Sequence, residues 1–152
     1  MKNIMTSHFT LFALLLSCSS IAQTIKVGDR YAGGIIYRLD GSGKHGWLVS
    51  DQDIRDSITY NAALELCDTL KIEGKKGWKM PAGNDWDTFN GMPGILSLVI
   101  AKRLKFDHLY YWTYSATASS TSANARIVSG DYHSVAFYRD RSRIALRVVR
   151  KF

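Results

Sequence analysis

Three arginines near the C-terminus alternate along the chain, at Arg139, Arg141 and Arg143. Guanidinium groups are planar donors that bind sulfate, phosphate or carboxylate in a bidentate manner, and alternation places several of them on one side of a hairpin. A fourth arginine and three ring side chains lie near them in the sequence: Arg126, Tyr132, His133 and Tyr138. Tyrosine rings stack on sugar faces while their hydroxyls reach sugar hydroxyls, so the set favours an anionic glycan as ligand. The competing interpretation is a solvated basic hairpin with no ligand.

The net charge lies in the same part of the chain. The 152 residues carry a formal net charge of +7. Residues 100–152 hold ten Lys and Arg against three Asp and Glu, whereas residues 23–99 hold nine against ten. A basic C-terminal third favours an anionic partner. A surface charge without functional meaning is the alternative.

Motifs for catalysis and metal binding are missing from the sequence. It contains no HExxH, paired CxxC or GxSxG motif, and residues 41–44 (GSGK) lack the spacing of a phosphate-binding loop. Asp51, Asp53 and Asp56 resemble a calcium loop, but Arg55 occupies the third ligand position, so we expect a polar turn. Three histidines stand alone, without cysteine or carboxylate at ligand spacing: His45, His108 and His133. We therefore expect a non-enzymatic protein with no catalytic residues, no metal and no cofactor.

The N-terminus has the features of a signal peptide. Lys2 supplies a positive start, residues 11–16 (LFALLL) form a short apolar segment, and Ser20 and Ala22 are small residues at the cleavage positions. The sequence predicts a signal peptide over residues 1–22 and a mature chain that begins at Gln23.

An alternative processing site and the remaining apolar runs bear on localisation. Residues 15–18 (LLSC) form a loose lipobox, so acylation at Cys18 is the alternative to a free chain. The longest later apolar run, residues 95–101, falls far short of the roughly 20 residues that span a bilayer. We therefore expect a secreted, periplasmic or cell-surface protein with no transmembrane helix in the mature chain. An exported protein rarely meets nucleic acid, so we expect none as a partner.

The mature chain, residues 23–152, has the length of one domain. Apolar spacing and turn residues predict a strand pair, then two or three helices, then an antiparallel meander. The expected elements are strands 33–37 and 46–50, a helix over 59–73, an extended passage 77–81, a brief helix from 84, a helix over 95–104, and strands 109–117, 125–129, 134–139 and 144–150. Strands and helices do not alternate, so the layout is α+β.

Six segments, in this order, resemble the C-terminal domain family of Lcl-type collagen-like adhesins. They are residues 33–37 with 39–40, 43–46, 63–67, 77–81 (GWKMP), 111–115 (YWTYS) and 146–150 (LRVVR). The resemblance spans the mature chain and implies a C-type-lectin-like fold, secretion and a binding role, in a domain of otherwise unknown function. Some members bind sulfated glycans or other surface ligands. The chain lacks the collagen-like Gly-X-Y stalk of these adhesins, so trimers are in doubt and the oligomeric state stays open.

The resemblance also assigns structural roles. The residues it places in backbone geometry or core packing are Gly33, Gly34, Trp47, Trp78, Pro81 and Trp112. Arg147 and Arg150 belong to its closing motif, and we expect them to form fixed salt bridges or hydrogen bonds. The function we expect is a secreted, lectin-like binding module that recognises sulfated or uronic-acid glycans through its basic C-terminal hairpins. The alternative is a protein-interaction or structural module of the bacterial cell envelope, with a cell-surface protein as its partner.

Overall fold

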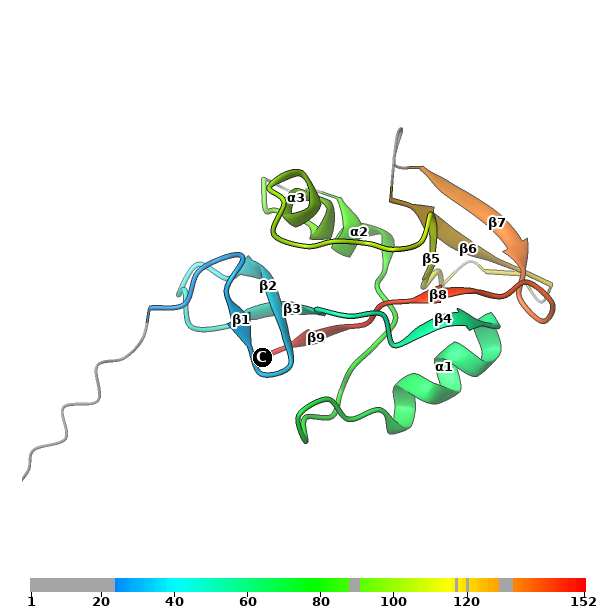
Figure 1. Cartoon of the computed structure of the whole chain (residues 1–152), viewed down its shortest axis with the longest axis horizontal. Helices are drawn as coiled ribbons and strands as arrows, with labels where there is room; N and C mark the ends of the chain where they lie inside the picture. The colour runs from blue at the N-terminus through cyan, green and yellow to red at the C-terminus, as the bar shows by residue number, and fades with distance from the viewer. Residues whose placement is uncertain (1–23, 88–90, 117, 120, 129–132) are drawn as a thin grey trace, which may run out of the picture.

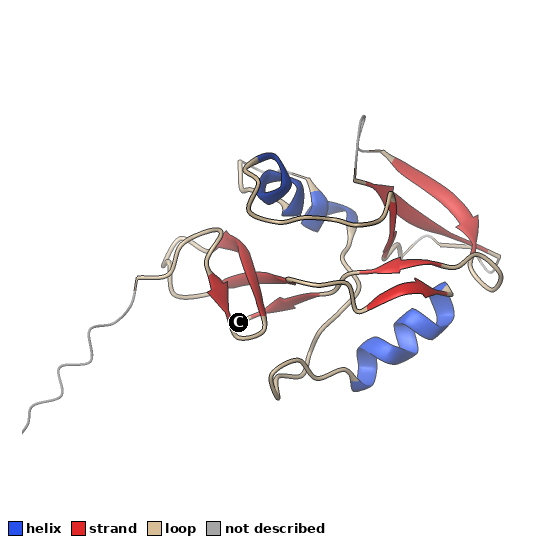
Figure 2. Ribbon diagram, in the orientation of Figure 1, coloured by secondary structure: helices blue, strands red, loops and turns tan. Residues whose placement is uncertain are grey.

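The computed structural model describes residues 24–87, 91–116, 118–119, 121–128 and 133–152. The predicted signal peptide, with Cys18, lies outside the described residues. The described chain is an α+β domain, as expected, with three helices and two sheets (Figures 1 and 2).

The first sheet has the strand order β1-β2-β3-β9 and is antiparallel. Its strands are β1 (Arg30–Tyr31), β2 (Gly34–Leu39), β3 (Gly46–Ser50) and β9 (Val149–Lys151). The pairing of β2 with β3 confirms the predicted N-terminal hairpin. Gly34 is required here, because a Cβ atom at this position would lie 2.6 Å from the carbonyl oxygen of Val49 on the neighbouring strand.

The second sheet has the strand order β4-β8-β5-β6-β7. Its strands are β4 (Arg55–Ile58), β8 (Ile144–Leu146), β5 (Tyr110–Thr113), β6 (Ser122–Ile127) and β7 (Ser134–Tyr138). The chain passes from the first sheet to the second between β3 and β4 and returns between β8 and β9, so these two crossings lie side by side (Figure 1).

The predicted meander is confirmed for β5, β6 and β7 and is wrong for the last segment. Residues 144–150 were expected to form one strand that follows β7. Instead β8 lies between β4 and β5, parallel to β5, and β9 joins the first sheet. Residues 144–149 are all buried, and a continuous buried run suits a central strand rather than an edge strand.

The helices are α1 (Tyr60–Thr69), α2 (Gly83–Trp86) and α3 (Ile95–Ile100). Both predicted longer helices end earlier than expected. Helix α1 stops because Leu70 is extended, and α3 stops shortly before Lys102, which has a positive φ of 55°. The apolar residue Leu104 is nevertheless buried in the same cluster as α3, which explains why the apolar pattern continued.

The core has two parts, and β5 separates them. Successive residues of a strand point to opposite faces, so Trp112 enters the cluster beside α1 while Tyr111 enters the cluster beside α3. Both rings are fully buried. The Trp112 Nε1 atom donates a hydrogen bond to the Ile58 carbonyl oxygen at 2.7 Å, which ties β5 to the end of β4.

Candidate functional site

The structure disperses the arginines that the sequence analysis grouped. Arg126 lies on β6, is only 9% exposed and forms an ion pair with Asp87. Its guanidinium is therefore committed within the protein, and we correct its assignment to a ligand-binding face. The spacing along the sequence shows that Arg126 is near the hairpin but not that its side chain points into the fold.

Arg139 is also held by the protein. Its Nε atom donates to Asn61 Oδ1 at 3.0 Å, and its Nη1 atom donates to the Ser119 carbonyl oxygen at 2.9 Å. The guanidinium carbon lies 5.0 Å from the centre of the Tyr60 ring. Arg139 therefore joins the end of β7 to the start of α1 and presents little free donor capacity to a ligand.

The remaining predicted residues stay on the surface. Arg141 lies against the exposed Tyr138 ring, with Cζ 4.5 Å from the ring centre. Arg143 and His133 are exposed, whereas Tyr132 lies outside the described residues. The hairpin thus brings together Tyr138 and Arg141, on a turn rather than in a cavity.

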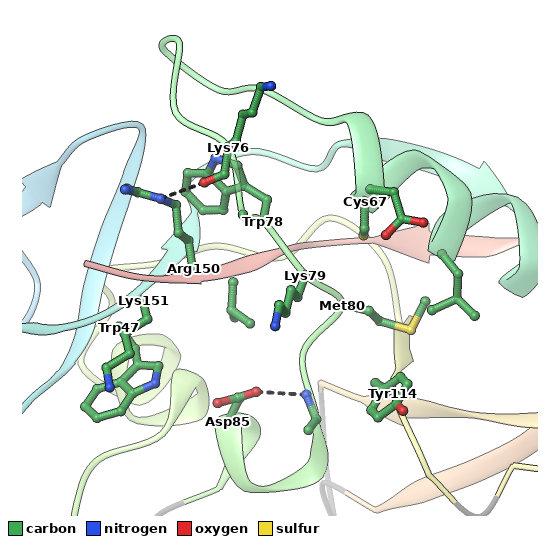
Figure 3. A pocket seen from close by; sticks show the side chains of 15 residues that line it. Trp47, Cys67, Lys76, Trp78, Lys79, Met80, Asp85, Tyr114, Arg150 and Lys151 are labelled. Carbon is green, nitrogen blue, oxygen red and sulfur yellow. Dashed lines mark hydrogen bonds between the residues drawn. The ribbon is translucent and has the colours of Figure 1, made fainter.

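A cleft of about 980 Å³ opens elsewhere, where the segment that contains Trp78 passes beside β9 (Figure 3). Its lining combines four cations, three aromatic residues and two acids: Lys76, Lys79, Arg150, Lys151, Trp47, Trp78, Tyr114, Asp68 and Asp85. Ligand sites in proteins are typically concave and hold a few polar groups beside aromatic walls. This cleft, rather than the turn, has the shape of a binding site.

The backbone explains how these residues meet. Lys79 and Val149 exchange two backbone hydrogen bonds, at 2.8 and 2.7 Å, so the segment runs along β9. The Tyr114 amide then donates to the Pro81 carbonyl oxygen at 2.8 Å, which connects the same segment to the second sheet. Along it, Trp78 and Met80 are buried while Lys79 between them is exposed to the cleft (Figure 3).

Trp47 forms the aromatic wall beside β9. Its ring lies 5.4 Å from Lys151 Nζ and 5.6 Å from Arg38 Cζ. Arg38 is buried and donates hydrogen bonds to the carbonyl oxygens of Pro93 and Asn84, so it is a fixed support for the ring. The resemblance assigned Trp47 to backbone geometry or core packing. The half-buried ring packs against the core cluster of Tyr37 and Val49, and it also lines the cleft.

The cleft is electropositive. Among the described residues, none of its four cations forms an ion pair. Asp85 is occupied, because it accepts hydrogen bonds from the Tyr37 hydroxyl at 2.7 Å and the Ala82 amide at 2.8 Å. Burial and the nearby Asp85 carboxylate raise the pKa of Tyr37, so its proton stays in place. The lysine ammonium groups are left to bind an incoming anion.

Arg150 has a mainly structural role, as the closing motif implied. Its Nε atom donates to the Lys76 carbonyl oxygen at 3.0 Å, which fixes the rim of the cleft (Figure 3). Its Nη1 atom is buried without a hydrogen-bond partner among the described atoms. Arg147 meets the same expectation in full, with its guanidinium bound to Asp53 and to three backbone carbonyls.

Two features of the sequence indicate the basic lining of the cleft, but not its position. Residues 75–79 (KKGWK) place three lysines around a tryptophan, and residues 150–151 add two more cations. The family pattern includes residues 77–79 and Arg150 but not Lys75, Lys76 or Lys151. Nothing in the sequence shows that the two segments lie side by side, because this depends on the pairing of Lys79 with Val149.

The chain matches no family model and no curated protein. No helix in the described part of the chain is long and apolar enough to cross a membrane.

His108 is not as isolated as its sequence position indicated. Its Nε2 atom lies 3.7 Å from Asp53 and 3.5 Å from Asp56, so these three residues offer a possible cation-binding arrangement. Asp53 already accepts hydrogen bonds from Arg147 and from the Tyr111 hydroxyl. Asp53 therefore supports Arg147 and Tyr111, whereas Asp56 is exposed and contacts only His108 among these residues.

Cys67 provides a test of burial at the cleft wall. Burial raises the pKa of its thiol from 9.0 to about 11, so the neutral thiol is favoured in the folded state. Because the unfolded chain loses the thiol proton more easily than the folded protein, ionisation of Cys67 lowers the free energy of unfolding. The folded state keeps its full stability below pH 9 and loses part of it as the pH rises from 9 to about 11. We expect iodoacetamide to modify Cys67 slowly in the native protein, with a rate that rises with a midpoint near pH 11.

Mass spectrometry of the peptide that contains Cys67 measures this rate. The urea-unfolded chain is the control and should show a midpoint near pH 9, the ordinary value for the thiol. Equal midpoints in both states would show that the thiol is not shielded from water.

Proposed function

We propose that this protein is a secreted, non-enzymatic, C-type-lectin-like binding module for anionic glycans, as its resemblance to Lcl-type C-terminal domains implies. The observation that carries the proposal is the cleft, where lysines that form no ion pair with any described residue lie beside the half-buried ring of Trp47. Lysine binds sulfate or carboxylate as a point charge, and the indole face packs against a sugar ring. Together these groups fit a saccharide that carries an acidic substituent.

The chemistry of the cleft also supports binding without catalysis. Cys67 is the thiol in its wall, and its raised pKa keeps it protonated near neutral pH, where a thiol is a poor nucleophile. Both oxygens of Asp85 already accept hydrogen bonds, which reduces its capacity as a general base.

The test is a pair of double variants with equal charge change. The first, Lys79→Ala with Lys151→Ala, removes two cations from the cleft. The second, Arg141→Ala with Arg143→Ala, removes two from the hairpin. Charge-assisted hydrogen bonds are each worth about 1.5–3 kcal/mol, so the first variant should weaken binding by at least about tenfold while the second changes it little.

Binding is measured by calorimetry against sulfated, uronic-acid and neutral oligosaccharides over a salt series. We expect saturable binding of acidic oligosaccharides that weakens as the salt concentration rises, because screening reduces charge attraction. Loss of binding in the hairpin variant alone would move the site to Arg141 and Arg143. No saturable binding at moderate salt would contradict the proposed function.

A further inference from the structure

Strand β7 forms a free edge of the second sheet (Figure 1). Among the described residues, β6 is the strand that pairs with it, and nothing pairs with its other side. Natural edge strands are usually protected by charged residues or proline. The opposite edge, β4, reads RDSI and is protected by two charges, whereas β7 reads SVAFY and contains neither charge nor proline.

Hydrogen bonds at the two ends of β7 show which backbone groups point outward. The His133 carbonyl oxygen accepts from the Ile127 amide at 2.9 Å, and the Arg139 amide donates to the Thr121 carbonyl oxygen at 3.1 Å. Alternate residues of an antiparallel ladder form such bonds, so the other odd-numbered residues of β7 also face β6. The even-numbered residues direct their backbone groups away from β6: Ser134, Ala136 and Tyr138.

The contact of Tyr138 agrees with this pattern. Its carbonyl oxygen accepts a hydrogen bond from the Ser142 amide at 3.0 Å in the following turn, and not from β6. Within the described part of the chain, the amides of all three residues and the carbonyl groups of Ser134 and Ala136 have no hydrogen-bond partner and can therefore pair with another strand.

The charge at the end of β7 indicates what kind of strand fits. The Arg141 side chain is 73% exposed and lies 3.8 Å from Asp140, an ion pair open to solvent. Arg143 is exposed and forms no ion pair with a described residue. A second copy of this chain carries the same positive net charge and would be repelled, whereas an acidic segment would be attracted.

We propose that β7 is a docking edge for an extended acidic segment of a partner protein, which adds to the sheet as a further strand. The partner backbone pairs with Ser134, Ala136 and Tyr138, and its acidic end lies beside Arg141, whose guanidinium packs on the Tyr138 ring. Backbone pairing of this kind provides affinity, and charge at its end provides selectivity. This docking edge is separate from the cleft and does not depend on glycan binding.

Proline at position 136 tests the docking edge without breaking the sheet. The Ala136 amide faces away from β6, so it can donate a hydrogen bond only to a carbonyl oxygen of a partner strand. Ala136→Pro removes this donor. Proline is tolerated at such positions of an edge strand, so the sheet should stay intact. Val135→Pro is the contrasting variant, since it removes an amide that bonds to β6 and should destabilise the hairpin.

The probe is a nonapeptide with acidic ends and an alternating Val-Thr centre, compared with the same peptide carrying lysine ends. We expect saturable binding of the acidic peptide to the native protein, and at least about tenfold weaker binding to Ala136→Pro. Hydrogen exchange should show new protection at the amides of Ser134, Ala136 and Tyr138 and little change at Val135 and Phe137. Arg141→Glu with Arg143→Glu should reverse the preference between the two peptides.

Several outcomes would overturn the proposal. They are no saturable binding at millimolar peptide, equal binding to Ala136→Pro, or a preference for the lysine peptide. A concentration-dependent dimer that Ala136→Pro abolishes, seen by light scattering, would assign the edge to a second copy instead. Glycan binding should be unchanged in Ala136→Pro and peptide binding unchanged in the cleft variant, so failure of one proposal is distinguishable from failure of the other.

Discussion

Replacing Arg147 with methionine should lower the free energy of unfolding by roughly 3–5 kcal/mol, the usual cost of breaking a buried ion pair from one side. The Arg147 side chain is 2% exposed and pairs with Asp53, which is 7% exposed. Its remaining N–H groups donate to the carbonyl oxygens of Ser50, Asp51 and Lys105, at 3.1, 3.0 and 2.9 Å. The substitution leaves these acceptors and the carboxylate without their donor.

Urea unfolding followed by circular dichroism measures the effect. Arg143→Met is the matched control, because Arg143 is exposed and should change the stability by no more than about 0.5 kcal/mol. Adding Asp53→Asn to Arg147→Met should recover part of the loss, since it removes the unpaired buried charge. A loss below about 1 kcal/mol in Arg147→Met would show that the ion pair is not a main support of the crossing between the sheets.

Local patterns predicted the elements that depend on local signals. The hairpin of β2 and β3 follows from glycine and turn residues, and α1 follows from the helical spacing that buries Tyr60, Ala63 and Cys67. The placement of β8 could not be predicted in this way. Strand β8 pairs with β4 on one side and β5 on the other, and these strands are distant from it in the sequence. Its position is therefore set by the tertiary arrangement of the whole sheet.

The candidate site was harder to predict than the fold. A count of charges locates basic segments but does not show which cations are already paired. Arg126 and Arg139 resemble Arg141 in sequence, yet Asp87 and Asn61, far away along the chain, hold the first two. Conversely, Lys79 and Lys151 lie 72 positions apart in sequence and meet at one cleft because the segment of Lys79 pairs with β9.

The arrangement of the paired and unpaired cations supports a separation of roles. Arg38, Arg126, Arg139 and Arg147 bind carbonyl, amide or carboxylate oxygens of the protein itself. Among the described residues, the lysines at the cleft and Arg143 form no ion pair, and Arg141 forms a solvent-exposed one with Asp140. The basic residues of the described chain are therefore divided between internal supports and two separate surfaces that can bind anions.

Two tryptophans should separate stability from binding. Trp112→Ala should cost roughly 3–5 kcal/mol of unfolding free energy, because a large core ring is removed and a cavity remains. The Trp112 ring is fully buried and makes edge contacts with Tyr60 and Phe137, at 5.4 and 6.4 Å between ring centres. Its truncation also leaves the Ile58 carbonyl oxygen without a donor.

Trp47→Ala is the matched substitution at the cleft. The Trp47 ring is half-buried, so its loss should reduce stability by less than the loss of Trp112 and should weaken the binding of acidic oligosaccharides. Urea unfolding and calorimetric titration of both variants measure the two effects. If Trp47→Ala bound oligosaccharides as well as the native protein, the ring would not contact the ligand, because truncation of a stacked indole removes contact area that lysines cannot replace.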